Sequence, residues 1–177
     1  MSIAHVLFGF EGRLNRARWW GFTLLALVGL VVSVTLMTVL AALLAPTPTG
    51  LIVFTLIGYL PFLWIGTALG VKRLHDRDKS GALLLVYYGV PFLLSLLVLY
   101  MSTDLAALAA ALNPQARPTA STVATVGSRT VVILLLQGVS FAVSVWGLID
   151  LGFLDGTPGR NRYGRDPTSK TYHPVHG

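Results

Sequence analysis

Three long stretches of the chain contain no Asp, Glu, Lys, Arg or His. They run from Trp19 to Val71, from Ser80 to Thr103 and from Thr130 to Ile149. A helix rises about 1.5 Å per residue, so about 20 apolar residues cross a hydrocarbon core of about 30 Å. The first stretch is therefore long enough for two crossings, and each of the other two is long enough for one.

The first stretch is interrupted at its centre by Pro46-Thr47-Pro48-Thr49-Gly50, a run of helix breakers and turn formers. Every backbone group inside a bilayer must be paired within its own segment, so the crossings are expected to be helices. The pattern predicts an all-α, polytopic membrane protein with four transmembrane helices in a single membrane domain, residues 1–177. The expected helices cover about 19–44, 51–71, 82–101 and 130–149.

Basic residues flank these helices unequally, since all but Arg117 and Arg129 of the 13 Lys and Arg lie on one predicted side. The positive-inside rule then places both termini in the cytoplasm, with cytoplasmic segments 1–18, 72–81 and 150–177 and an outer loop 104–129. Within that loop, Leu105–Leu112 is rich in Leu and Ala. This part is expected to form a short interfacial helix or to extend the third transmembrane helix.

Composition narrows the classes of function. With 54% hydrophobic residues, 11% charged residues and no cysteine, the chain is not an ordinary soluble enzyme, a disordered tail or a disulfide scaffold. The net charge of +6 does not indicate nucleic-acid binding, because the basic residues stand where membrane topology requires them. No charge lies inside a predicted crossing, which disfavours an ion pathway built on buried carboxylates.

Two features of the crossings leave an alternative open. Pro61 and Pro91 interrupt the second and third helices, and Gln137, Ser140 and Ser144 form a polar stripe on the fourth. Such features are typical of a substrate crevice in a small-solute transporter or channel subunit, which with four helices would have to work as an oligomer. They are equally typical of close helix packing, which we favour.

The N-terminal segment combines apolar and basic residues. Residues 3–10 have helical apolar spacing and are expected to lie at the membrane interface. Arg13, Arg16 and Trp20 would share one face if their segment is helical, and Trp19 and Trp20 are expected to anchor at headgroup depth. The arginines are expected to hold a lipid phosphate or a carboxylate from elsewhere in the chain.

The segment 72–81 contains His75 and Asp76, a pair that resembles a base and its orienting acid. Neighbouring residues on a helix do not face each other, and no nucleophile or metal-ligand set accompanies them. We therefore expect no catalytic residues, no metal and no cofactor. Asp76 is expected to pair with Arg73, Arg77 or the N-terminal arginines.

A third segment, Asp155–Pro167, is rich in Gly and Pro and is expected to fold as compact turns docked on the other two. The three segments carry Gly12-Arg13-x-x-Arg16-x-x-Trp19-Trp20, then Arg73-Leu74-His75-Asp76 with Ser80-Gly81, then Gly156-Thr-Pro-Gly-x-Asn161-x-Tyr163-Gly164-x-Asp166-Pro167. In this order they resemble the bacterial membrane family called domain of unknown function 805. The resemblance implies a small multi-pass inner-membrane protein and brings no established activity.

The leading hypothesis is a cytoplasmic polar cap that binds a lipid headgroup, an anion or a partner protein. Its candidate residues are Arg13, Arg16, Arg73, His75, Asp76, Arg77, Ser80, Asn161, Tyr163 and Asp166. The expected partners are membrane lipids, with a second copy of the chain or another membrane protein as further candidates, and not nucleic acid. The lowest-ranked alternative is a headgroup-modifying enzyme that uses His75 and Asp76 as acid and base.

Overall fold

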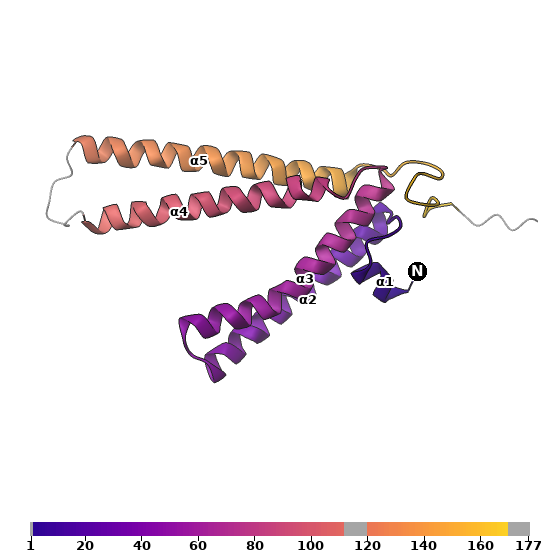
Figure 1. Cartoon of the computed structure of the whole chain (residues 1–177), viewed down its shortest axis with the longest axis horizontal. Helices are drawn as coiled ribbons and strands as arrows, with labels where there is room; N and C mark the ends of the chain where they lie inside the picture. Colours follow the sequence, from indigo (N-terminus) through magenta and orange to yellow (C-terminus); the bar gives the residue numbers. More distant parts are fainter. Residues whose placement is uncertain (1, 112–119, 170–177) are drawn as a thin grey trace, which may run out of the picture. The chain divides into compact units, whose positions relative to one another are not determined.

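The computed structural model describes residues 2–111 and 120–169, with side chains described for 2–102 and 127–169 (Figure 1). Its helices are α1 (Ile3–Phe8), α2 (Arg16–Leu44), α3 (Pro48–Asp76), the π-helical turn η1 (Leu85–Gly89), α4 (Val90–Ala111), α5 (Ala120–Leu148) and the π-helical turn η2 (Ile149–Phe153). In these ranges, β-type pairing is limited to one isolated bridge between Asn161 and Gly164.

Four of the described helical segments are long and apolar enough to span a membrane. They are Arg16–Leu44, Pro48–Asp76, Leu85–Ser102 and Gly127–Phe153. This finding confirms the predicted all-α, polytopic fold. The side of the membrane on which the termini lie stays a prediction.

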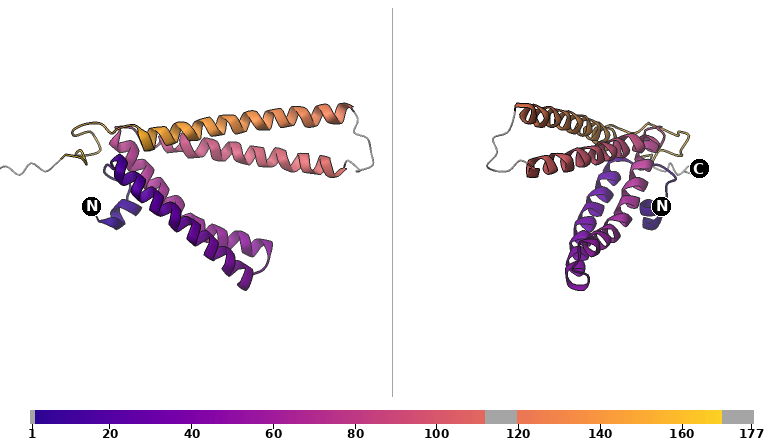
Figure 2. Two further views of the ribbon diagram at one scale, coloured as in Figure 1. Left: turned by 180° about the vertical axis from the view of Figure 1, so that it is seen from behind. Right: turned by 60° about the vertical axis from the view of Figure 1, so that its left-hand side comes forward.

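The chain packs as two compact units. One holds the residues up to Leu83 and those from Asp150 onward, and the other holds Leu84–Ile149. In the first unit α2 and α3 lie side by side as a hairpin with α1 against α3, and in the second α4 pairs with α5 (Figures 1 and 2). Whether residues 1–177 form a single membrane domain stays a prediction.

Small residues bring α2 and α3 close together. The Ser33 hydroxyl donates to the carbonyl of Gly58 at 3.1 Å, and a Cβ added at Gly58 would lie 3.0 Å from Cγ of Met37. The outward faces of the same helices are apolar, with Leu25 and Val32 more than half exposed. Close packing inside the hairpin and apolar side chains outside it are what a bilayer requires.

Helix α2 begins three residues before the expected Trp19. Its N-cap residue is Asn15, whose side-chain oxygen accepts from the amide of Arg18 at 2.9 Å, and Gly12 has a positive φ of 89°. The turn at Gly12 and the extended Asn15 keep Arg13 outside the helix. The condition under which Arg13, Arg16 and Trp20 would share one face, a helix through all three, is therefore not met at Arg13.

Helix α3 is longer than the expected 51–71 at both ends. Its N-cap residue Thr47 accepts from the amide of Gly50 at 3.0 Å, and Pro48 occupies the first turn, where its missing N–H is harmless. At the other end the helix continues through the charged residues to Asp76. The predicted end at Val71 marks where the apolar run stops, whereas the helix itself stops later.

Helices α4 and α5 extend into the segment 104–129 that was expected to be a loop. The third helix continues to Ala111, which is the extension considered from the Leu/Ala-rich sequence, and α5 begins at Ala120. The addition to α4 is rich in Ala, the best helix former, and this explains its extension. The rest of the expected loop, residues 112–119, lies outside the described residues.

The third crossing begins with a π-helical turn instead of a regular α-helix. The polar stripe of the fourth crossing is exposed. The π-helical turn η1 directly precedes Pro91, whose missing N–H removes one α-helical bond. On α5, Gln137 and Ser144 are exposed, and the Ser144 hydroxyl donates to the carbonyl of Ser140 in its own helix. In the second unit this stripe therefore faces outward.

Candidate functional site

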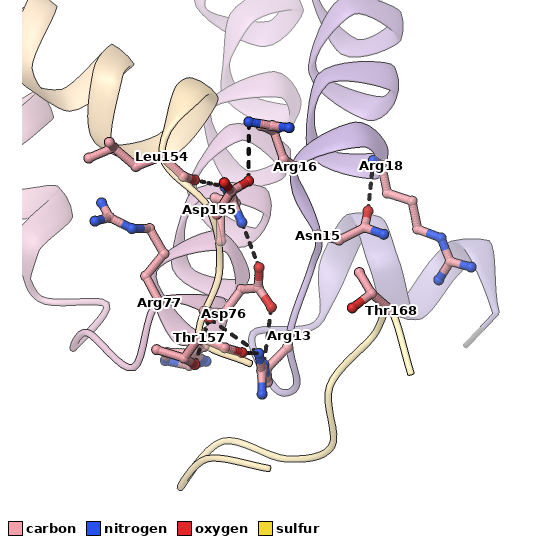
Figure 3. Close-up of polar contacts among 12 residues, drawn as sticks. Arg13, Asn15, Arg16, Arg18, Asp76, Arg77, Leu154, Asp155, Thr157 and Thr168 are labelled. Atoms are coloured by element: carbon pink, nitrogen blue, oxygen red, sulfur yellow. Dashed lines mark hydrogen bonds and ion pairs between the residues drawn. The ribbon is translucent and has the colours of Figure 1, made fainter. Parts of the chain in front are cut away.

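The three charged segments of the sequence meet in the first unit. We call this structure the polar cap and define it as residues 9–15, 72–81 and 150–169 (Figure 3). Its charged side chains are deeply buried, since Arg13, Lys72, Arg73, Asp76 and Asp150 are each at most 4% exposed. Among the described residues, every buried side-chain nitrogen or oxygen has a hydrogen-bond partner.

Asp76, the last residue of α3, is the centre of the polar cap. Its Oδ1 accepts from Nε of Arg13 at 3.1 Å, and its Oδ2 accepts from Nη1 of Arg73 at 2.6 Å. One carboxylate is thus shared by two buried guanidinium groups, one from the N-terminal segment and one from the preceding turn of α3. The pairing of Asp76 with Arg73 and with an N-terminal arginine follows the sequence prediction.

The two arginines also fasten the C-terminal segment to α3. Arg13 donates to the carbonyls of Thr157 at 2.5 Å and of Gly159 at 2.6 Å, while Arg73 donates to the carbonyl of Leu151 at 2.7 Å and to that of Leu154. Each guanidinium therefore joins a carboxylate to backbone carbonyls, a use that suits its rigid set of donors.

The backbone of the C-terminal segment approaches Asp76 closely at two consecutive residues. The amide and hydroxyl of Thr157 donate to the Asp76 carbonyl at 2.8 Å and 3.0 Å. A Cβ added at Gly156 would lie 2.1 Å from Oδ2 of Asp76, closer than any real side chain can approach. Glycine is therefore the residue that permits this contact.

His75 is held on two sides. Its ring stacks on Tyr163 with centroids 3.8 Å apart and an angle of 6° between planes, and its Nδ1 lies 3.3 Å from the carbonyl of Gly12. Asn161 Nδ2 donates to the His75 carbonyl at 2.8 Å. The His75 ring and the Asp76 carboxylate thus have separate partners, an arrangement that differs from a base with its orienting acid.

Asp166 organises the turns of the C-terminal segment. Its Oδ1 accepts from the amide of Thr168 at 2.8 Å and from its hydroxyl at 2.6 Å, and its Oδ2 accepts from the amide of Gly159 at 3.0 Å. These hydrogen bonds, those from Thr168 first, lower the pKa of Asp166 from 3.8 to about 2.

Acidification is expected to open this turn. Because the folded pKa of Asp166 lies below its ordinary value, the stabilisation is present above pH 3.8 and is lost as the pH falls to about 2. The measurement is hydrogen exchange at the amides of Gly159 and Thr168, corrected for the intrinsic rate at each pH. The Asp166→Asn variant should exchange faster at these amides and show no such change in this range; an unchanged pH response in the variant would contradict the assignment.

A second buried carboxylate, Asp150, is also shared by two cations. Lys79 Nζ lies 2.7 Å from its Oδ1, and Arg77 pairs with the same oxygen and donates to the Asp150 carbonyl at 3.1 Å. Burial, followed by the nearby charge of Arg77, lowers the pKa of Lys79. Arg77 therefore belongs to this second cluster, whereas the sequence analysis considered it a partner for Asp76.

An open cavity of about 320 Å³ lies between the start of α2 and the C-terminal segment. It is lined by Arg13, Asn15, Arg16, Ala17, Asp76, Asp155, Gly156, Thr157, Pro158, Asp166 and Thr168. On this cavity, Arg16 and Asp155 form an ion pair of 3.1 Å whose side chains are 51% and 84% exposed. The cavity thus combines satisfied buried charges with one exposed pair (Figure 3).

The structure brings together most, but not all, of the residues predicted for the site. Ser80 is exposed, and its hydroxyl accepts from the amide of Ala82 at 3.3 Å. The prediction also missed residues that build the polar cap, namely Lys72, Lys79, Gly156 and Thr157. Lys72 carried a usable signal, because it is the first charge after a long apolar run.

Trp19 differs from the expected interfacial anchor, whereas Trp20 is half-buried and its depth in the membrane stays a prediction. Trp19 is 4% exposed, and the Trp20 indole N–H donates to the carbonyl of Gly152 at 2.9 Å. The two rings contact each other edge to face, and Trp20 also packs on Phe153. This pair therefore fixes η2 against α2 inside the protein.

Comparison with known proteins identifies the family of the chain. The family described as "Protein of unknown function (DUF805)" matches residues 7–165. The chain is similar to "Uncharacterized protein YiiR" of Escherichia coli (strain K12), with 30% identity over 172 residues that cover 97% of this chain and 94% of the relative. It is also similar to "Inner membrane protein YhaI" of the same strain, with 38% identity over 94 residues that cover 52% of this chain and 72% of the relative. No solved structure gives a significant match.

Proposed function

The chain belongs to the DUF805 family of inner-membrane proteins of unknown function, and from the geometry of its polar cap we propose that it binds a phosphate-bearing group there without catalysing a reaction. The single observation that carries this proposal is the exposed pair Arg16–Asp155 on the open cavity at the start of α2. The polar cap is proposed to lie in the cytoplasm, as the positive-inside rule indicates.

The buried charges of the polar cap are poorly suited to exchange a ligand. Arg13 and Arg73 each donate to a carboxylate and to backbone carbonyls, and both are at most 4% exposed. Removing one partner from a buried charge cluster costs several kcal/mol, on the order of 3–5. Arg13 therefore forms part of the cavity wall, and Arg73 supports it from behind through Asp76.

Arg16 also contacts a backbone carbonyl, that of Phe153 at 3.0 Å, but unlike Arg13 and Arg73 its side chain is half exposed. An exposed ion pair contributes only about 0–1 kcal/mol, so the Arg16–Asp155 pair opens at little cost. The guanidinium stands in the first turn of the long helix α2, where the helix dipole also favours an anion. A phosphate oxygen that replaces Asp155 on Arg16 would gain a charge-assisted pair at the positive end of α2.

The partners of His75 and Asp76 are the reason why the proposed function is non-enzymatic. The His75 ring is stacked on Tyr163, and both oxygens of Asp76 accept from arginines, so these groups serve the structure. Phosphates reach this position either as lipid headgroups, which the adjacent membrane presents, or as free anions. Membrane lipids are the partners we favour, because the membrane lies beside the cavity, and the experiment separates the two sources.

Replacing Arg16 with Gln is expected to weaken binding about tenfold, since a charged hydrogen bond contributes roughly 1.5–3 kcal/mol and 1.4 kcal/mol is a factor of ten. Binding is measured by titrating the full chain in neutral detergent with inorganic phosphate. A parallel titration uses vesicles of phosphatidylcholine with and without phosphatidylglycerol. Binding of both probes indicates a free-anion site, and binding of the lipid alone indicates a headgroup site.

The matched control is Arg18→Gln, which removes the same charge from an exposed residue two positions along α2. It is expected to change either affinity by less than about twofold, the size of an exposed charge effect. If both variants weaken binding equally, the effect comes from general surface charge, and the proposal is overturned. Failure of both probes to bind would overturn it as well.

A further inference from the structure

The N-terminal segment contains apolar side chains that are not buried by the protein. Ile3 is 70% exposed and Phe8 is 53% exposed, whereas Val6 between them is 7% exposed and lies on the side of α1 that packs on α3. Residues 2–10 also contain no Asp, Glu, Lys or Arg. An uncharged segment with one buried and one exposed apolar face needs a second apolar environment.

Contacts along α3 determine how deep this segment lies. The carbonyl of Phe8 accepts from the indole N–H of Trp64 at 3.2 Å, and the Phe10 ring meets the Trp64 ring edge to face at 5.1 Å. Trp64 lies within the apolar run of α3, eight residues before the first charge at Lys72. That spacing corresponds to about 12 Å along the helix axis. Phe8 and Phe10 therefore lie closer to the bilayer centre than the charged end of α3.

Lys72 connects α1 to the charged end of α3. Its side chain is fully buried, and its Nζ donates to the carbonyls of His5 at 2.8 Å and of Val6. These carbonyls belong to the last turn of α1, where a cation is favourable, and the carbonyl of His5 also accepts from the amide of Gly9 at 3.1 Å. Its ammonium thus joins α1 to α3 through backbone oxygens, in contrast to the arginines that share Asp76.

We propose that residues 3–10 form an interfacial anchor, in which Ile3 and Phe8 insert into the lipid of the same leaflet that surrounds α2 and α3, and that Lys72 and Trp64 hold it at that depth. The exposed side chains of this segment contact lipid, because they continue the apolar exterior of the α2–α3 hairpin at the level of Trp64. This inference is independent of ligand binding at the cavity.

The chain contains no cysteine, so single labels can be placed cleanly. The full chain is reconstituted in phosphatidylcholine nanodiscs with a spin label at Ile3→Cys, Phe8→Cys, Val53→Cys or Ser169→Cys. Collisions with oxygen and with an aqueous nickel chelate give the depth of each label. The label at residue 8 is expected about 5–10 Å below the phosphate level, as interfacial helices lie. Val53, in the crossing, should be accessible to oxygen and protected from the chelate, and Ser169 should read as aqueous.

A second step tests the role of Lys72. In the Phe8→Cys background, Lys72→Met keeps the apolar stem and removes the ammonium, and it is expected to make the label more mobile and shallower. Arg18→Met is the matched control and should change neither reading, while an unchanged depth at Val53 shows that the hairpin remains inserted. If the labels at residues 3 and 8 are accessible to the aqueous chelate in the chain that retains Lys72, the proposed anchor is overturned. An unchanged label in Lys72→Met would overturn the role of Lys72 in holding it.

Discussion

Replacing Asp76 with Asn is expected to unfold the polar cap while the four membrane helices remain helical. The substitution keeps the shape of the side chain but removes the charge that Arg13 and Arg73 share at 3.1 Å and 2.6 Å. Two guanidinium groups, each at most 4% exposed, are then left without their carboxylate. Breaking a buried charge cluster in this way costs about 3–5 kcal/mol, which is a large part of the stability of an ordinary domain.

The measurement is hydrogen exchange at the Thr157 amide, which donates to the Asp76 carbonyl at 2.8 Å, together with the helix content by circular dichroism. Exchange at this amide is expected to rise by a factor of more than about 100, the equivalent of 3 kcal/mol, with little change in helix content. Asp155→Asn is the matched control because its carboxylate is 84% exposed, and it should change the local stability by less than about 1 kcal/mol. If the Thr157 amide is equally protected from exchange in Asp76→Asn and in Asp155→Asn, Asp76 does not organise the polar cap.

The membrane helices could be predicted from the sequence because their signal is local. A long run without charge requires a helix in lipid whatever the rest of the chain does. The helix ends were less predictable, since α3 continues past Val71 to Asp76 and α5 begins at Ala120. Hydropathy reports where the apolar environment ends, while helix ends depend on capping residues and on propensity.

The polar cap was predicted in part, because attraction between Asp76 and the arginines follows from charge alone. The choice of the cations that pair with Asp76 depends on contacts between residues far apart in sequence. One such contact is the 2.6 Å hydrogen bond from Arg13 to the Gly159 carbonyl. The same limit explains the error at Trp19. A tryptophan beside an apolar run is typical of a membrane interface, but here the C-terminal segment covers it, and Trp64 takes the position next to the exposed apolar segment.

Replacing Gly156 with Ala is expected to disrupt the polar cap almost as strongly as the loss of the Asp76 charge. The added Cβ would lie 2.1 Å from Oδ2 and 2.6 Å from Cγ of Asp76. The carboxylate cannot move aside easily, because Arg13 and Arg73 hold its two oxygens and Asp76 ends the helix α3. Relief therefore requires the C-terminal segment to withdraw from α3, at a cost of about 3 kcal/mol, the upper range for overpacking a tight site.

Gly21→Ala is the matched control, because Gly21 lies in the first turns of α2 and a Cβ added there meets nothing within 4 Å. Protection of the Thr157 amide should fall in Gly156→Ala and stay unchanged in Gly21→Ala. The double variant Gly156→Ala with Asp76→Asn is expected to be little worse than either single variant, since both break the same contact. Additive losses in the double variant would instead mean that the close approach of Gly156 to Asp76 is unimportant.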